Sequence, residues 1–445
     1  MSKNQFKSRL GFILTAAGSA IGLGAIWKFP YIAGISGGGA FFLIFILFTL
    51  LLAMPLLLGE FLIGRTASKS AIEAYTEIAP STKWNLIGVL GMVTVFLLLS
   101  FYSTIGGWIV IYIFKGITGS LTLAPQSDYS MIFNNISSSP LLTLTGHFIF
   151  LFIIVYIVSR GVDRGIEKAS SIMMPILFVI FILVIIRSLT LEGAMEGVKF
   201  LLYPDFTKLT SQSILYALGQ SFFALSLGCS AMVTYSAYLP KDSNINSATV
   251  SIVSMNLLVI LLAGLSIFPG VFTFGLSPAE GPSLLFSVLP NVFSRVPFGI
   301  VFFVGFLILF LFAALTSGFS MLEILVSSTI KGDNTKRVKT SLIIGLIIFI
   351  VGIPSTLSFG IMSEFKLFSL TYFELVDFAV SNILMPLGAL LIAIFIPLNI
   401  KKDKLYNILS YPKPIPRIIF QLWYYIIKYI VPIAIIIVFL NSINI

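Results

Sequence analysis

The chain has 445 residues, of which 58% are hydrophobic and 10% charged, and its mean hydropathy is +1.06. A soluble domain has about 25% charged residues, so this composition excludes a soluble enzyme or binding protein and indicates an integral membrane protein. The net charge of +10 lies mostly in short loops between apolar runs, which favours membrane lipid over nucleic acid as the partner of the basic residues.

Apolar runs of about 20 residues recur along the whole chain and are typical of transmembrane helices. We therefore predict an all-α polytopic membrane protein with eleven transmembrane helices. In chain order they cover residues 10–34, 40–63, 86–117, 141–159, 171–190, 213–239, 247–274, 298–328, 340–357, 372–398 and 416–441. The basic, proline-containing loop 400–416 is predicted to anchor the chain at the lipid surface.

The loops alternate in basic charge. Nineteen Lys and Arg residues fall on the side of the N-terminus and five on the opposite side. The positive-inside rule then predicts a multi-pass membrane protein with the N-terminus in the cytoplasm and the C-terminus outside. No small-residue cleavage site follows the first apolar run, so we expect a retained helix there.

The first predicted span contains a stretch that should interrupt a helix. Residues 16–30 read "AAGSAIGLGAIWKFP", with three glycines in seven residues, and the sixth span contains "SLGCS" at residues 226–230. Small-residue packing could explain the first stretch alone. Interruptions at the start of two successive five-helix blocks instead predict a transporter whose binding site lies between inverted repeats, since unwound backbone can bind ligands.

Polar side chains occur where the spans should cross the bilayer. Thr316 and Ser317 are adjacent hydroxyls in the eighth span, Glu323 follows them, Glu60 lies in the second span and Asp377 in the tenth. A charge at the bilayer centre costs at least about 2.5–3.5 kcal/mol, so these residues are expected to face the interior. Two roles are left open for Glu60: it could bind the unwound backbone, or it could contact a substrate.

His147 and Cys229 are each the single residue of their type. His147 is near the outer end of the fourth span, so we predict an interfacial histidine, with a proton relay as the alternative. Cys229 excludes an intrachain disulfide and is predicted to line a pocket rather than to act in redox chemistry.

The ordered motifs of this chain resemble those of the neurotransmitter:sodium symporter family, and specifically its bacterial amino-acid transporters. They include "RLGFILTAAGSAIGLGAIWKFPY", "MPLLLGEFLIGR", "RGVDRGIEKASSIMMP", "GQSFFALSLG" and "LTSGFS". The resemblance implies one transmembrane domain over residues 1–445 with a five-plus-five inverted repeat, broken helices 1 and 6, repeats at about 10–190 and 213–398, and an extra eleventh helix at about 416–441.

The resemblance also implies an amino-acid site. The backbone of Leu23 and Gly24 and the Tyr102 hydroxyl are expected to bind the carboxylate, and the carbonyls of Ala20, Phe223 and Ser226 the amino group. The expected side-chain pocket is formed by Ser19, Leu98, Tyr102, Phe223, Ser226, Cys229, Ser317 and Met321. Phe223 would be the lid and Lys28 with Asp377 the outer gate, while the expected structural polar residues are Glu60, Gln220 and Tyr238.

Two sodium sites follow from the same resemblance. The second site would use the carbonyls of Gly18, Ile21 and Ala313 and the hydroxyls of Thr316 and Ser317. At the first site the family has an Asn where this chain has Ala25, and a Thr or Ser where it has Ala224; Asn256 and the carbonyls of Ala20 and Ala224 remain. We therefore predict a weakened first site and coupling to fewer sodium ions than is usual in the family.

Chloride dependence and the inner gate are less defined. Residues 256–264 contain neither the acid typical of chloride-independent relatives nor the Ser of chloride-dependent ones. Chloride dependence therefore stays open, with Glu323 as another source of negative charge. Lys3, Phe6 and Arg9 stand where the family has a basic and aromatic latch.

The predicted function is sodium-coupled symport of a neutral, hydrophobic amino acid, aromatic or large aliphatic, by alternating access. The alternatives are a proton-coupled or ion-independent amino-acid transporter, a non-transporting amino-acid sensor of the same fold, or a channel. The sequence offers no nucleophile and base that would define an enzyme. The oligomeric state is left open.

Overall fold

The computed structural model describes residues 6–121, 123–124, 128–240, 243–276 and 284–443. Nearly all of the described chain is helical, and its two strands, β1 (Lys366–Leu367) and β2 (Leu370–Thr371), form a short antiparallel hairpin. The helices of the first half are α1 (Arg9–Ala20), η1 (Gly24–Lys28), α2 (Phe29–Ile35), α3 (Gly39–Phe48), η2 (Thr49–Ala53), α4 (Met54–Ala67), α5 (Ala71–Ile78), α6 (Asn85–Ile117), α7 (Tyr129–Ser137), α8 (Pro140–Ser159), η3 (Val162–Glu167), α9 (Lys168–Leu189), α10 (Ala194–Leu202) and η4 (Phe206–Lys208).

The second half continues the helical pattern to the end of the described chain. Its helices are α11 (Ser211–Phe223), α12 (Ala231–Ala237), α13 (Ile245–Thr273), η6 (Leu284–Val288), α14 (Leu289–Ser294), α15 (Gly299–Ile330), η7 (Asn334–Lys336), α16 (Arg337–Leu357), α17 (Tyr372–Phe378), η8 (Ala379–Leu384), α18 (Met385–Asn399), α19 (Lys402–Leu409), α20 (Arg417–Tyr425), η9 (Ile426–Ile430) and α21 (Val431–Ile443).

The predicted spans correspond closely to these helices. In the described residues, nine continuous helical segments are long and apolar enough to cross a bilayer, and Arg9–Ala20 with Gly24–Ile35, bent by 52°, qualifies as a tenth span. The predicted sixth span consists of α11 and α12, with 13 and 7 residues, each shorter than the roughly 20 residues that a crossing needs. The prediction of a polytopic helical fold with two broken spans is confirmed.

The fifth span begins earlier than predicted, at Val162 rather than residue 171. Its first turns contain charged residues, which is why the sequence predicted a loop there. In the structure these residues bind the N-terminal tail. The Glu167 carboxylate accepts the backbone N–H of Lys7 at 2.8 Å and that of Ser8 at 3.2 Å, and the Lys7 ammonium lies 3.6 Å from Asp163. Phe6 is buried, whereas Lys3 of the expected latch lies outside the described residues.

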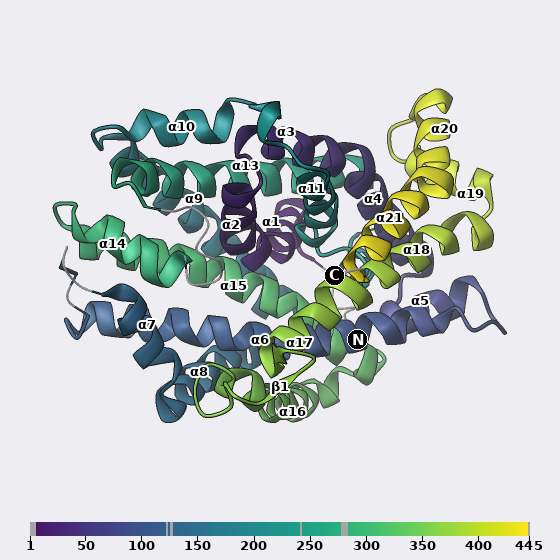
Figure 1. Cartoon of the computed structure of the whole chain (residues 1–445). Coiled ribbons are helices and arrows are strands. Elements are labelled where there is room, and N and C mark those ends of the chain that lie inside the picture. The colour runs from purple at the N-terminus through teal and green to yellow at the C-terminus, as the bar shows by residue number, and fades with distance from the viewer. Residues whose placement is uncertain (1–5, 122, 125–127, 241–242, 277–283, 444–445) are drawn as a thin grey trace.

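The two broken spans occupy the middle of the bundle (Figure 1). Helix α1 packs against α9, α13 and α15, whereas α11 packs against α3 and α21 and α12 packs against α4. The helices α20 and α21 lie at one edge, where α21 contacts α18 (Figure 1). This arrangement surrounds both breaks with continuous helices.

Candidate functional site

The first break begins at the end of α1. Ile21 has φ −86° and ψ 80°, so the helix stops there, and it resumes as η1 at Gly24. Gly22 is required between them, because a Cβ at this position would lie 2.8 Å from the Ser317 hydroxyl oxygen and 3.0 Å from that of Tyr102. Polar side chains of α15 and α6 therefore fill the space beside the unwound backbone.

The second break, residues 224–230, has positive φ at Ser226 (53°), Gly228 (87°) and Ser230 (59°). This left-handed backbone interrupts the regular α-helical ladder, and side chains bind some of its polar groups. The buried Glu60 carboxylate accepts the Gly228 N–H at 2.9 Å, and the Ser230 and Tyr75 hydroxyls are 3.1 Å apart. These contacts favour the backbone role for Glu60.

Between the breaks lies a cavity of about 20 Å³. Its lining residues are Ala20, Gly22, Leu23, Gly24, Leu98, Tyr102, Phe223, Ser226, Ser317, Met321 and Met385. Nine of the eleven predicted pocket residues are among them. Ser19 and Cys229 are not; the Ser19 carbonyl accepts a hydrogen bond from the Ser226 hydroxyl at 3.2 Å, and the Cys229 thiol donates to the Ser226 carbonyl at 3.0 Å.

Gly22 and Met385 line the cavity but were missing from the prediction. The signal for Gly22 was the glycine-rich break itself, which implies a neighbour that tolerates no side chain. Met385 had no comparable signal, because it begins α18 far along the chain and reaches the cavity only through packing against the second break.

Several polar groups lie among the residues that line this cavity. Leu23 and Gly24 begin the second half-helix of the first span, where N–H groups and the helix dipole favour an anion. The Tyr102 hydroxyl, which donates to the Ala314 carbonyl at 3.2 Å, lies beside the Leu23 backbone and Ser317. The Gln220 amide donates to the Gly24 carbonyl at 2.8 Å and so ties the half-helix to α11.

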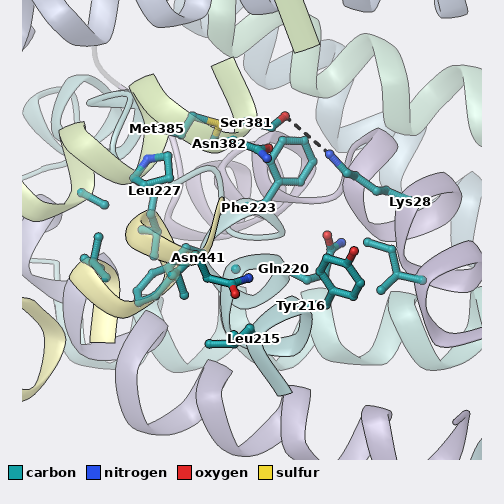
Figure 2. Close-up of a pocket in the computed structure, with 17 residues that line it drawn as sticks. Lys28, Leu215, Tyr216, Gln220, Phe223, Leu227, Ser381, Asn382, Met385 and Asn441 are labelled. Atoms are coloured by element: carbon teal, nitrogen blue, oxygen red, sulfur yellow. Dashed lines mark hydrogen bonds between the residues drawn. The ribbon is translucent and has the colours of Figure 1, made fainter. Parts of the chain in front are cut away.

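Phe223 closes the cavity beneath the predicted outer gate. The Lys28 ammonium lies 4.6 Å from the centroid of the Phe223 ring and 3.8 Å from the Asp377 carboxylate. It also donates to the Ser381 hydroxyl at 3.5 Å, as Figure 2 shows. Lys28 and Asp377 remain 30% and 36% exposed, and such pairs stabilise by only about 0–1 kcal/mol.

A second cavity, of about 160 Å³, lies beyond the lid between α11, α18 and α21 (Figure 2). Phe223 and Met385 line both this cavity and the smaller one. The two cavities are therefore separated by flexible side chains. Outward displacement of this partition would enlarge the inner cavity.

The predicted second sodium site lies where α1 crosses α15. The Thr316 hydroxyl is 3.1 Å from the Gly18 carbonyl and 3.1 Å from the Ala313 carbonyl. The helix ends at Ile21, and Ser317 is next to Gly22. Oxygen ligands of this kind suit a hard cation, so the residues present fit sodium.

The predicted first sodium site offers fewer side-chain oxygens than the family pattern, because two of its positions are alanines. Ala25 and Ala224 present methyl groups, and both are buried. Asn256 of α13 is also buried, and its side-chain nitrogen donates to the carbonyls of Ala20 at 3.3 Å and Ala224 at 3.0 Å. The residues thus come together as predicted, but the Asn256 amide presents donors to the two carbonyls rather than another oxygen.

Glu323 belongs to a separate buried cluster near the N-terminal tail. Its carboxylate forms an ion pair with Arg337 and accepts the Tyr238 hydroxyl at 3.1 Å, and the Arg337 Nε donates to the Val158 carbonyl at 3.0 Å. Because Arg337 compensates its charge, Glu323 is not the isolated negative charge that we considered in place of chloride. Arg337 itself had been counted only as a loop cation.

His147 is fully buried, so the prediction of an interfacial histidine was wrong. Its Nε2 is 2.9 Å from the Ser103 hydroxyl, and its Nδ1 is 2.8 Å from the Thr356 hydroxyl, which is 2.9 Å from the Thr104 hydroxyl. The Ser103 hydroxyl is also 2.7 Å from the Leu99 carbonyl, and the Thr356 hydroxyl is 3.1 Å from the Gly352 carbonyl. This chain joins α6, α8 and α16.

Two broken helices that meet at a small cavity, with carbonyl and hydroxyl oxygens beside it, define the class of secondary transporters with inverted repeats. The chain belongs to the sodium:neurotransmitter symporter family, which it matches over residues 3–136 and 142–445.

Individual relatives agree with this assignment. The chain is 57% identical to the "uncharacterized sodium-dependent transporter YhdH" of Bacillus subtilis over 99% of its own length and 98% of that protein, and 34% identical to a sodium-dependent transporter of Haemophilus influenzae over 99% and 98%. The crystal structure of MhsT in complex with L-phenylalanine superposes with a TM-score of 0.92 at 40% identity, covering 99% of this chain and 100% of MhsT.

Proposed function

We propose that this protein couples the inward movement of sodium to the uptake of a neutral, hydrophobic amino acid across the bacterial cytoplasmic membrane, with its N-terminus in the cytoplasm. The observation that carries the proposal is the cavity between the breaks, where half-helix N–H groups and the Tyr102 hydroxyl meet apolar side chains. Such a site binds a carboxylate and an ammonium at one end and an apolar side chain at the other.

The residues that line the inner cavity support a neutral, hydrophobic amino acid as the substrate. Among the described lining residues no side chain is charged, and Leu98, Phe223, Met321 and Met385 form an apolar wall. The cavity of about 20 Å³ is smaller than an aromatic or large aliphatic side chain, so the wall must yield on binding. Phe223 and Met385 also border the larger cavity, so they have space into which they can move. The flexible methionine side chain changes its conformation readily. MhsT, the structural relative, was crystallised with L-phenylalanine.

Sodium at the second site would tie α1 to α15 through Gly18 and Thr316. An ion that binds better to one orientation of the broken helices shifts the population toward that orientation, which is how a gradient can drive transport. The weakened first site supports coupling to fewer ions than is usual in the family. The bundle that contains the two broken helices would be the part that moves relative to the scaffold of continuous helices.

The proposed function is tested by uptake of radiolabelled phenylalanine, leucine and lysine into proteoliposomes, with sodium, proton and chloride gradients imposed separately. We expect accumulation of phenylalanine and leucine, but not lysine, under an inward sodium gradient. Accumulation under a proton gradient alone would instead support the proton-coupled alternative. Binding without accumulation under any gradient would support a sensor.

Gly24 provides a test of the lid. A Cβ at Gly24 would lie 2.8 Å from the Phe223 ring, so Gly24→Ala should displace the lid. Overpacking costs about 1–3 kcal/mol, and we therefore expect KM for the amino acid to rise at least about fivefold. Gly219→Ala is the matched control, since its Cβ meets Val438 at an ordinary 3.5 Å. Equal KM values for both variants would contradict the role of Phe223 as the lid.

A further inference from the structure

Asn256 connects the two breaks. Its side-chain nitrogen, on α13, donates to the carbonyl of Ala20, the last residue of α1, and to that of Ala224, the first residue after α11. All three residues are buried, with exposed fractions of 3% or less. One amide therefore donates to one carbonyl from each broken span, and the Ala20 carbonyl also accepts the Gly22 N–H at 3.2 Å.

Two carbonyl oxygens that converge in a buried region need positive charge between them. An unsatisfied buried carbonyl costs about 1–3 kcal/mol, and two of them close together also repel each other. Either a bound cation or a pair of hydrogen-bond donors meets this requirement. The Asn256 amide supplies the donors at 3.0 and 3.3 Å.

The surrounding residues do not fit a cation at the same point. A hard cation requires a shell of several oxygens. The side chains of Ala25 and Ala224 offer only methyl groups there, and the Asn256 amide faces the two carbonyls with its nitrogen, while its oxygen has no hydrogen-bond partner among the described residues. The carbonyls of Ala20 and Ala224 alone make an incomplete shell.

We propose that the Asn256 amide takes the place of the first sodium ion, as a permanent cross-link between the two broken spans. The protein then binds a single sodium, at the Thr316–Ser317 site, and moves one sodium per amino acid. Asn256 is a positioning residue, because it holds the Ala20 backbone at the edge of the substrate cavity. The transport stoichiometry rests on the proposed function, whereas the number of bound ions can be measured without transport.

The test is equilibrium binding of ²²Na⁺ to the purified protein, with and without saturating phenylalanine. We expect about one sodium per chain, with a Hill coefficient of about 1. The double variant Ala25→Asn/Ala224→Thr restores two side-chain oxygens and should bind about two sodium ions, with a Hill coefficient between 1 and about 2. The variant Ala25→Leu/Ala224→Val adds similar bulk without oxygen and should bind no more than one.

A second variant keeps the proposal testable if the double variant does not fold. In Asn256→Asp the carboxylate cannot donate to the carbonyls and attracts a cation, so a second sodium should bind at high concentration, whereas Asn256→Leu should gain none. Two sodium ions on the unaltered protein would overturn the proposal, as would a count of one for both oxygen-adding variants. Failure of amino-acid uptake with a sodium count of one would overturn the proposed function and not this inference.

Discussion

Sodium-driven uptake by Thr316→Val is expected to fall at least about tenfold. The substitution removes the hydroxyl that lies 3.1 Å from the Gly18 carbonyl while keeping a β-branched side chain of similar size. Loss of a residue that merely supports a metal ligand already lowers affinity about 10–100-fold, and Thr316 would be a ligand itself. The measurement is the initial rate of uptake at increasing sodium concentrations, where the half-saturating sodium concentration should rise.

The effect should be specific to this pair of hydroxyls. Ser317→Ala is expected to act in the same direction, since Ser317 is beside Gly22 in the same break. Thr329→Val is the control on the same helix, because its hydroxyl donates only to the Leu325 carbonyl of α15 at 2.7 Å. Sodium dependence that survives unchanged in Thr316→Val and Ser317→Ala would show that the second sodium site is elsewhere.

Arg337→Met is expected to destabilise the fold by about 3–5 kcal/mol, because it leaves the Glu323 carboxylate buried without its cation. The two side chains are 4% and 0% exposed, so water cannot replace the missing partner. The measurement is thermal unfolding of the purified protein, together with the yield of monodisperse material. Tm should be lower for Arg337→Met than for the unaltered protein.

Two further variants separate this ion pair from charge effects in general. Lys336→Met removes the neighbouring cation, which pairs with Asp333 at 3.0 Å but is 70% exposed, and should change stability by less than about 0.5 kcal/mol. Adding Glu323→Gln to Arg337→Met removes the unpaired charge and keeps an acceptor for Tyr238, so it should restore part of the stability. A double variant no more stable than Arg337→Met would rule out the unpaired carboxylate as the cause.

The sequence predicted the fold and most of the cavity, because their signals are local. Glycine-rich interruptions identified both breaks, and the adjacent hydroxyls of Thr316 and Ser317 marked the helix that crosses the first one. Lys28 and Asp377, which were expected to pair, lie 3.8 Å apart, whereas the contact of Gln220 with the Gly24 carbonyl was not foreseen. These residues lie in long motifs that fix their positions relative to the breaks.

The remaining features depend on contacts between distant segments. Arg337 has the sequence signature of a loop cation, and only the packing of α16 against α15 brings it to Glu323. His147 is near a helix end in the sequence, yet α6 and α16 cover it. Cys229 belongs to the second break, but its thiol donates a hydrogen bond to the backbone of that same segment. The sequence could not show that this side chain does not line the cavity.

The hydrogen-bond chain through His147 has a mechanical consequence. Thr104, Thr356, His147 and Ser103 are linked in this order by contacts of 2.9, 2.8 and 2.9 Å, and Ser103 continues the chain to the Leu99 carbonyl at 2.7 Å. Sliding α8 past both α6 and α16 would break the two buried hydrogen bonds of His147, each costing about 1–3 kcal/mol. These three helices therefore behave as one stiff frame, and strain produced at the breaks would be relieved by tilting the short half-helices instead of deforming their support.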